Sequence, residues 1–257
     1  NIIIDNKTCS IFYENIIKKK FKILKFSDPI YKLKSIKNIY EIKHMIEAHK
    51  KDGLALTKFI YWIKNINKKS ITEVDAQNKL EKFRRLNKDY LFPSFNTIAG
   101  AGSNGAIVHY RATSKNTKKI KKKDLFLIDS GGQYKYGTTD VTRTLCFTKQ
   151  KQNIKNAYTN VLKGHIAVAQ TNLSKANTGK KIDIRARKFL KKEGLDYAHG
   201  TGHGVGFFLN VHEGPQSISK HNNIKITNGM ILSNEPGYYK KNYFGIRIEN
   251  LIYVNKL

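Results

Sequence analysis

The spacing of apolar side chains predicts four helices. Apolar residues recur at helical intervals in four segments, which cover residues 35–65, 72–90, 152–172 and 181–193. Thr72 is suited to be the N-cap of the second helix, because acidic residues follow it in the first turn. Gly194 is expected to close the fourth helix, since glycine tolerates the left-handed backbone that often follows a helix.

Extended segments lie between and after these helices. Residues 96–110 predict a strand, a turn and a second strand, and residues 125–148 predict a β-hairpin. From Tyr197 onward the pattern is one of short strands and glycine-rich turns. Strands in blocks between helices favour an α+β fold over alternating βαβ units.

Asp28-Pro29 marks an expected domain boundary. Residues 1–27 have the pattern of a β-rich fragment, and we expect them to be the tail of a preceding domain with its linker. Residues 28–257 would then form the main domain. The first residue is not Met and the last strand stops abruptly at Leu257, so the sequence looks cut at both ends.

Charge and cysteine content narrow the function classes. The formal net charge is +29, but Lys supplies most of it and is spread along the chain, which favours a solvated surface over specific nucleic-acid recognition. No apolar run has the roughly 18 residues of a membrane helix, so we expect no membrane partner. The two distant cysteines, Cys9 and Cys146, are typical of a reducing cytoplasm.

Two carboxylates mark the predicted hairpin. Asp129 directly follows an apolar run at 125–128, and Asp140 returns in the second strand. A tight turn at Tyr134-Lys135 would place Asp129 opposite Asp140, with Cβ atoms roughly 5 Å apart. Facing like charges destabilise a sheet, and a divalent cation would compensate for them. The alternative is a polar hairpin with two solvent-facing acids.

Histidines gather further along the chain. His199 and His203 lie in the glycine-rich stretch HGTGHGVG, and His212 follows in NVHEGP. The spacing is not that of the helical zinc motif, which requires Glu after the first His. A lone His is more often structural than a ligand, but three on glycine-rich backbone favour a ligand site.

Two further carboxylates complete a candidate metal site. Glu235 follows an apolar run, and Glu249 lies in an apolar strand with Arg247 on the same face. A buried Glu249 requires a partner or a metal, although a surface pair with Arg247 is the alternative. The oxygen-rich set favours Mn²⁺ or Co²⁺ over structural Zn²⁺, and catalytic Zn²⁺ stays open. The candidate ligands are Asp129, Asp140, His203, Glu235 and Glu249.

Five blocks in this order resemble the catalytic domain of the Xaa-Pro aminopeptidase (aminopeptidase P) family. They are NTIAGAGSNGAIVHY, LIDSGGQYKYGTTDVTRT, HGTGHGVGFFLNVHEGP, SNEPGYY and FGIRIEN. The resemblance covers residues 28–255 and extends to a wider metallopeptidase family with prolidase, creatinase and methionine aminopeptidase. It implies that residues 28–257 are a catalytic domain with the pita-bread fold, a curved antiparallel sheet flanked by helices around two metals.

The resemblance also implies roles for the ligands. Asp129 would chelate one metal, Asp140 and Glu249 would bridge both, and His203 and Glu235 would complete the second. A hydroxide between two divalent ions, here expected to be Mn²⁺, would attack the scissile carbonyl. Glu235 would act as the general base.

The remaining site residues take roles from the same resemblance. His109 would line the substrate site near the scissile bond, and His212 would stabilise the developing oxyanion. His199 would shape the pocket for proline. Arg247 would orient Glu249 or contact the substrate.

The expected activity is hydrolysis of the bond between an N-terminal residue and a following proline. The expected partner is a peptide with proline at its second position, and the full-length protein is expected to be a cytoplasmic homodimer. Two alternatives stay open. One is a prolidase that acts on Xaa-Pro dipeptides. The other is a metal-free binding module of the same fold, although such a module should show broken ligand positions and this sequence shows none.

Overall fold

The protein, seen here as a computed structural model, is described over residues 1–66 and 71–255. The chain folds as two units, Asn1–Lys34 and Ser35–Leu257. The predicted domain boundary after residue 27 stays a prediction, and residues 256–257 of the predicted catalytic domain lie outside the described residues.

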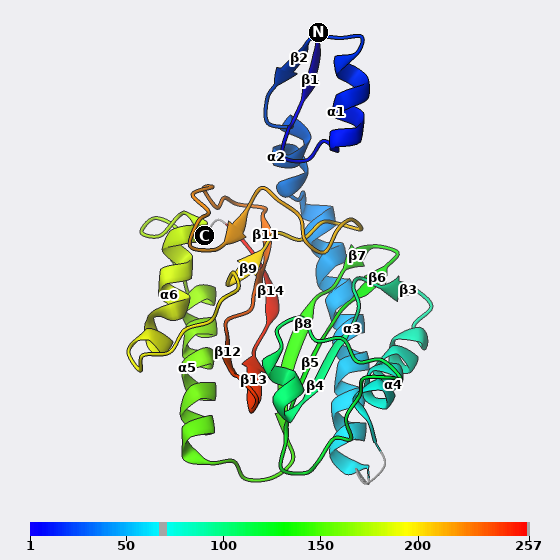
Figure 1. Cartoon of the computed structure of the whole chain (residues 1–257), viewed down its shortest axis with the longest axis vertical. Helices are drawn as coiled ribbons and strands as arrows, with labels where there is room; N and C mark the ends of the chain where they lie inside the picture. Colours follow the sequence, from blue (N-terminus) through cyan, green and yellow to red (C-terminus); the bar gives the residue numbers. More distant parts are fainter. Residues whose placement is uncertain (67–70, 256–257) are drawn as a thin grey trace. The chain divides into compact units, whose positions relative to one another are not determined.

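The first unit contains a parallel strand pair joined through a helix (Figure 1). Strand β1 (Ile2–Ile4) pairs with β2 (Ile23–Lys25), and α1 (Ile11–Lys18) connects them before α2 (Pro29–Ser35) follows. The sequence pattern suggested only extended structure here. Helix α1 was not predicted. Several of its apolar side chains are exposed, among them Phe12, so its apolar residues do not form one buried face.

Capping boxes start the first two helices of the second unit. Asn38 caps α3 (Ile39–Asn65) together with the side chain of Glu41. Thr72 caps α4 (Glu73–Arg85), as predicted from the sequence. Helix α4 ends earlier than expected, because the chain turns into strand β3 (Tyr90–Pro93).

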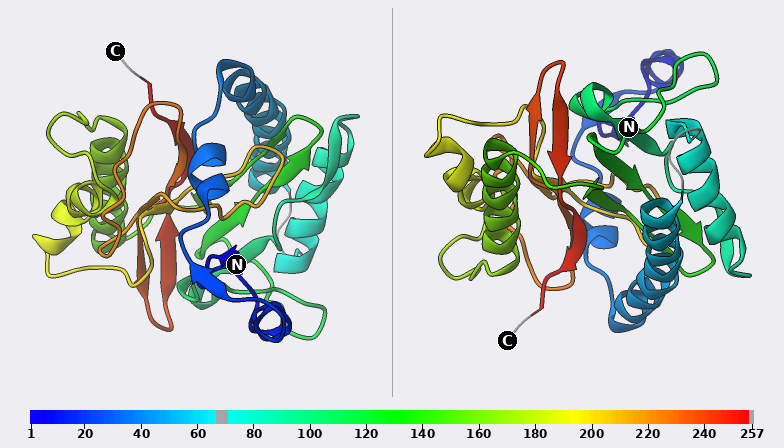
Figure 2. Two further views of the ribbon diagram at one scale, coloured as in Figure 1. Left: turned by 90° about the horizontal axis from the view of Figure 1, so that it is seen from above. Right: turned by 90° about the horizontal axis from the view of Figure 1, so that it is seen from below.

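The other two predicted helices are also confirmed. They are α5 (Gln152–Ala169) and α6 (Gly179–Lys191), and Gly194 follows α6 with a φ of +68°. The strands of the second unit lie between the pair α3 and α4 on one side and the pair α5 and α6 on the other (Figures 1 and 2). Each helix pair buries an apolar face against these strands.

Short antiparallel strands form the layer between the helix pairs. Strands β4 (Ile98–Ala101), β5 (Leu125–Ser130) and β8 (Val141–Cys146) form one sheet in that order. Strand β6 (Gly132–Tyr134) pairs with both β3 and β7 (Gly137–Thr138). The later strands form three two-stranded pairs. They are β9 (Gly202–His203) with β10 (Ser217–Ile218), β11 (Ile231–Asn234) with β14 (Asn250–Tyr253), and β12 (Gly237–Lys240) with β13 (Phe244–Arg247).

The hairpin is present, but its predicted register was wrong. The tight turn lies at Lys135-Tyr136, between β6 and β7, so Asp129 pairs with Thr142 and not with Asp140. Moving the turn by one residue shifts the register by two. Because side chains alternate with a period of two, this shift leaves both carboxylates on the same face of the sheet.

The second strand predicted within residues 96–110 is wrong. After β4 the chain forms a 3₁₀ helix, η1 (Gly102–Ala106), and then a turn that carries His109. Long-range contacts explain the difference, since Tyr110 donates a hydrogen bond to the buried carboxylate of Glu73 at the start of α4. Such a contact is invisible to a local pattern.

A buried ion pair joins α3, α4 and the hairpin. Arg84 donates hydrogen bonds to both oxygens of Asp52, at 2.6 and 3.0 Å, and Tyr134 donates a third at 2.8 Å. Burial alone would raise the pKa of Asp52, but the charge and hydrogen bonds of Arg84 outweigh it and hold the pKa below its usual value.

We predict that Arg84→Met destabilises the protein by about 3–5 kcal/mol, because it leaves the Asp52 carboxylate buried without its counter-ion. Arg85→Met is the matched control, since Arg85 is the next residue and pairs with Glu81 at the surface, where an ion pair contributes about 0–1 kcal/mol. Urea unfolding of both variants measures the difference. Equal midpoints for the two variants would contradict this assignment.

Candidate metal centre

A pocket of about 250 Å³ gathers every site residue predicted from the sequence. These residues come from distant parts of the chain, and the pocket also holds backbone of the HGTGHGVG stretch. The predicted residues that line it are His109, Asp129, Asp140, His199, His203, His212, Glu235, Arg247 and Glu249.

The candidate metal ligands lie where strands end or break. Asp129 is near the end of β5, and Asp140 lies in the short break between β7 and β8. His203 is in the two-residue strand β9, Glu235 directly follows β11, and Glu249 lies between β13 and β14. Because strands from several parts of the chain end here, their side chains can reach one pocket.

Crowded negative charge dominates the electrostatics of the pocket. Burial raises the pKa of Asp140 well above its usual value, and the carboxylates of Asp129 and Glu235 raise it further. Burial, then Asp140 and Glu235, raise the pKa of Glu249 well above its usual value. The pKa of Glu235 is raised mainly by burial, although His203 and Arg247 oppose this shift. A bound cation would stabilise the ionised form of all three groups.

His203 presents a lone pair to this cluster. Its Nδ1 lies 2.9 Å from the carbonyl oxygen of Gly204 and must carry the proton to donate to it. The neutral ring therefore has an unprotonated Nε2, which lies 3.4 Å from one oxygen of Asp140 and 3.4 Å from one of Glu235. A carbonyl that fixes the tautomer in this way is typical of metal-ligating histidines.

The donor set fits divalent metal ions. One ligand atom each from Asp140, His203 and Glu249 lie within 4.8 Å of one another. Asp129 adds a second indication, because its Oδ1 is buried and has no hydrogen-bond partner among the described residues. A buried carboxylate oxygen without a donor is costly unless a cation occupies its open side.

Arg247 has a different partner from the one considered on sequence grounds. It is 2 % exposed, so a surface pair with Glu249 is wrong, and its Nη2 donates to Asp129 Oδ2 at 2.6 Å. Its Nε donates to the Thr142 hydroxyl at 3.2 Å, and that hydroxyl donates to Glu249 at 2.6 Å. Arg247 therefore orients Asp129 directly and reaches Glu249 only through Thr142.

Sequence reasoning missed two residues of this network, Thr142 and Tyr239. The Tyr239 hydroxyl accepts from Arg247 Nη1 at 2.6 Å and lies 2.8 Å from His199 Nε2. A sequence pattern could have indicated Thr142, because Asp140, Thr142 and Thr144 are polar at a period of two. No such pattern indicates Tyr239, since its contact with Arg247 depends on the pairing of β12 with β13.

The other histidines border the pocket. His199 Nδ1 donates to the Gly200 carbonyl at 2.7 Å, so its Nε2 accepts from the Tyr239 hydroxyl. Burial, followed by the charge of Arg247, lowers the pKa of His199 to about 4. His212 stacks edge-to-face on His203 with ring centroids 4.1 Å apart, and both His212 and His109 keep solvent access.

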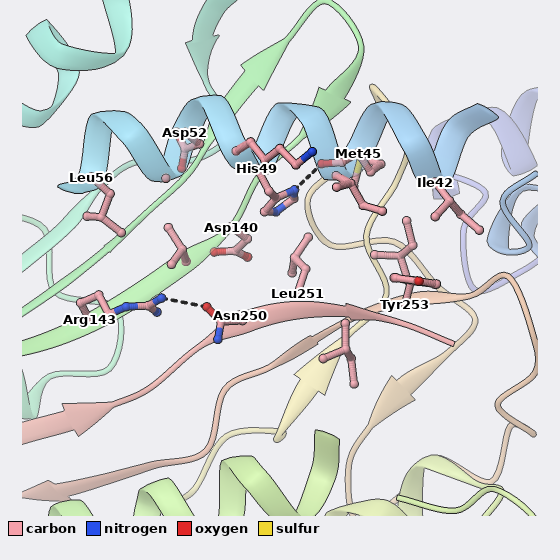
Figure 3. A pocket seen from close by; sticks show the side chains of 16 residues that line it. Ile42, Met45, His49, Asp52, Leu56, Asp140, Arg143, Asn250, Leu251 and Tyr253 are labelled. Carbon is pink, nitrogen blue, oxygen red and sulfur yellow. Dashed lines mark hydrogen bonds between the residues drawn. The ribbon is translucent and has the colours of Figure 1, made fainter. Parts of the chain in front are cut away.

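A second pocket adjoins the site behind Asp140 (Figure 3). It has a volume of about 540 Å³, lies between α3 and β14, and is lined mostly by apolar side chains. His49 donates from Nδ1 to the Met45 carbonyl at 2.7 Å, while its buried Nε2 has no partner among the described residues. Asp140 lines both pockets, so it forms part of the wall between them.

Named relatives are similar in sequence to this chain. A protein of Paracoccidioides brasiliensis (strain Pb03) named "Probable Xaa-Pro aminopeptidase P" is 47 % identical over 237 residues, which cover 90 % of this chain and 38 % of that protein. This chain therefore spans about 38 % of the length of that relative.

Solved structures share the fold. An X-prolyl aminopeptidase of Caenorhabditis elegans, described as a cytosolic enzyme with a di-nuclear active site, superposes with a TM-score of 0.84 at 35 % identity and covers 90 % of this chain and 38 % of that one. A prolidase from Pyrococcus furiosus superposes with a TM-score of 0.86 at 28 % identity and covers 99 % of this chain and 73 % of that one.

These comparisons confirm the predicted α+β class and the pita-bread fold. The sequence model of metallopeptidase family M24 matches residues 43–256, which include all candidate site residues. This chain belongs to metallopeptidase family M24.

Proposed function

We propose that this chain is the catalytic domain of a metal-dependent aminopeptidase that cleaves the bond between an N-terminal residue and a following proline. The main support is that four acidic side chains and the imidazole of His203 converge in a single pocket, where Asp129 has a buried oxygen without a hydrogen-bond donor among the described residues. The similarity to named Xaa-Pro aminopeptidases supports the choice of substrate.

Two divalent metals would be held by the five candidate ligands. The residues that would hold the metals are Asp129, Asp140, His203, Glu235 and Glu249. Bound there, the metals would lower the pKa of water and polarise the scissile carbonyl. We propose Mn²⁺ because oxygen donors predominate, with Co²⁺ or Zn²⁺ as alternatives.

Glu235 is proposed as the general base. The Ser233 hydroxyl donates to its Oε1 at 2.9 Å, which fixes the orientation of the carboxylate that would accept the proton. Glu235 would take the proton of the attacking water and pass it to the leaving proline nitrogen. It therefore combines ligation with proton transfer.

The histidines around the pocket are proposed to receive the substrate. His212 would donate to the oxyanion that develops on the scissile carbonyl. His199, held by Tyr239 and the Gly200 carbonyl, would border the proline ring. His109, in the turn after η1, would contact the substrate near the scissile bond.

Proline selectivity has a chemical basis in the bond itself. The Xaa-Pro amide is tertiary and its proline φ is fixed, so peptidase sites that bind the amide N–H cannot use it. A site that recognises the ring and polarises the carbonyl needs no such donor. The free substrate amine would lie near the carboxylates that hold the metals, where individual carboxylate oxygens would accept its hydrogen bonds.

Three further expectations belong to this proposal. We propose a cytoplasmic location and a homodimer for the full-length protein. We also propose that no membrane partner is involved, and none of the helices in the described residues is long and apolar enough to cross a membrane.

The second candidate activity is prolidase. It is favoured by the superposition on a prolidase from Pyrococcus furiosus, which covers nearly all of this chain. Both activities would use the same ligands, so the length of the preferred substrate separates them. The third possibility, a metal-free binding module, is disfavoured because all five ligand positions are intact and line one pocket.

We predict that the purified chain with Mn²⁺ hydrolyses Arg-Pro-Pro, but neither its N-acetylated form nor Arg-Ala-Ala. The N-acetyl group removes the free amine whose hydrogen bonds the carboxylate oxygens would accept, and Arg-Ala-Ala lacks the proline ring. Release of free arginine measures the rate. Faster cleavage of Ala-Pro than of Arg-Pro-Pro would instead establish prolidase, and equal cleavage of Arg-Ala-Ala would remove the proline requirement.

We predict that Asp140→Asn loses bound metal and activity together. The amide keeps the shape of the side chain but removes a negative charge that would help to hold the metals. Metal content by mass spectrometry and hydrolysis of Arg-Pro-Pro are the measurements. Glu193→Gln, which removes one exposed negative charge at the end of α6, serves as the control. Two metals retained in Asp140→Asn would refute this ligand assignment.

We predict that His212→Ala lowers kcat by about 10²–10³, the usual effect of removing one oxyanion donor. Metal content should stay unchanged, because His212 is proposed to contact substrate and not metal. His221→Ala, which removes an exposed His, controls for loss of an imidazole. An empty metal site in His212→Ala would make His212 a ligand and overturn its proposed role.

A further inference from the structure

A buried ion pair connects the start of α3 with the loop that carries His212. Lys37 Nζ donates to Glu213 Oε1 at 2.9 Å, and both side chains are 1 % exposed. The two residues are 176 positions apart in the sequence. Neither lines the candidate metal pocket, so the roles proposed above do not explain why a lysine is buried here.

Backbone hydrogen bonds hold the segment that carries Lys37. Its backbone N–H donates to the Gly229 carbonyl at 2.8 Å, and its neighbour Ile36 forms a β-bridge with Met230. The next residue, Asn38, is the N-cap of α3 and belongs to the capping box of that helix. The ammonium group of Lys37 is therefore carried by a backbone segment that is hydrogen-bonded on both sides.

Glu213 is held on the opposite side by the glycine-rich stretch. Its backbone N–H donates to the Gly204 carbonyl at 2.8 Å. Its carboxylate lies against Gly206, where an added Cβ would stand only 2.7 Å from Oε2. The absence of a side chain at Gly206 thus leaves space for the carboxylate. The Lys37–Glu213 pair therefore packs against the same glycine-rich segment that contains His203.

His212, the residue next to Glu213, depends on this backbone for its position. Its ring contacts His203 edge-to-face, but it makes no hydrogen bond among the described residues. The ring also keeps solvent access. A side chain without its own hydrogen-bond partner is placed by the backbone that carries it, and Glu213 is the buried anchor of that backbone.

We propose that Lys37 is a positioning residue, which acts through Glu213 to hold His212 over the candidate metal centre. This inference rests on the proposed function of His212. The pair is fully desolvated, so removing the ammonium leaves a buried carboxylate uncompensated and favours a rearranged loop. A displacement of about 1 Å at a catalytic group can cost about 10² in rate.

The test is a double-mutant cycle between Lys37→Met and His212→Ala. Lys37→Met alone should lower kcat by about tenfold or more, with little change in KM or metal content. In the His212→Ala background, Lys37→Met should cost no further kcat, because the group through which it acts is gone. Lys50→Met, which removes an exposed ion pair within α3, is the control.

A second measurement does not require activity. Amide hydrogen exchange over residues 206–213 should be faster in Lys37→Met than in the unchanged chain or in Lys50→Met, while exchange in α5 stays the same. If Lys37→Met does not fold, Glu213→Gln keeps the size of the side chain, weakens the same contact and enters the same cycle.

The outcomes separate this inference from the proposed function. If the unchanged chain does not cleave Xaa-Pro peptides, the proposed function fails, and the exchange measurement still tests the anchor. If the unchanged chain is active but the losses from Lys37→Met and His212→Ala multiply, Lys37 acts on general stability and the positioning role is overturned. Unchanged exchange in residues 206–213 overturns it as well.

Discussion

Several carboxylates are buried together in one small pocket, and the fold must compensate for their charge. Asp129, Asp140 and Glu249 are each less than 10 % exposed, and no water shell can disperse their mutual repulsion. Arg247 supplies one internal positive charge, directed at Asp129. One guanidinium cannot balance four acidic side chains, so the folded chain requires either protons, which the raised pKa values of Asp140, Glu235 and Glu249 reflect, or cations. Divalent metals satisfy the same requirement and add reactivity.

The fold meets this constraint through interrupted strands. A regular strand sends alternate side chains to opposite faces, so it cannot easily deliver ligands from many segments to one point. Several short strands instead end around one pocket, so that Asp140, Glu235 and Glu249 reach it from different segments. The helix pairs on either side carry the apolar packing that stabilises such an irregular layer. The buried Asp52–Arg84 pair then fixes the hairpin that bears Asp129 and Asp140 against α3 and α4.

Features that depend on neighbouring residues could be predicted from the sequence. Features that depend on pairing between distant segments could not. The N-cap Thr72 and the helical spacing of α3 and α5 are properties of a few neighbouring residues, so pattern reading found them. The predicted hairpin register was wrong because the tight turn lies one residue later than predicted, and this displaces every cross-strand pair by two residues. Arg247 and Tyr239 meet only once β12 and β13 pair, and Lys37 meets Glu213 across most of the chain. The candidate ligands could be predicted because their motifs lie in order along the sequence, and the structure brings these residues to one pocket.

The charge of the molecule and the charge of its pocket have opposite signs, and distance decides which one a substrate experiences. The net charge of +29 is carried mainly by surface lysines, whose field in salt decays over a Debye length of about 8 Å. The pocket is lined by acidic side chains with little exposed surface, so their interactions are screened far less. Without bound metal, a peptide with a free amine would therefore experience weak repulsion while approaching and attraction once it enters. In the proposed function, two divalent ions would offset the four carboxylates, so selection of an unblocked N-terminus would come from hydrogen bonds between the free amine and individual carboxylate oxygens rather than from the net charge of the pocket.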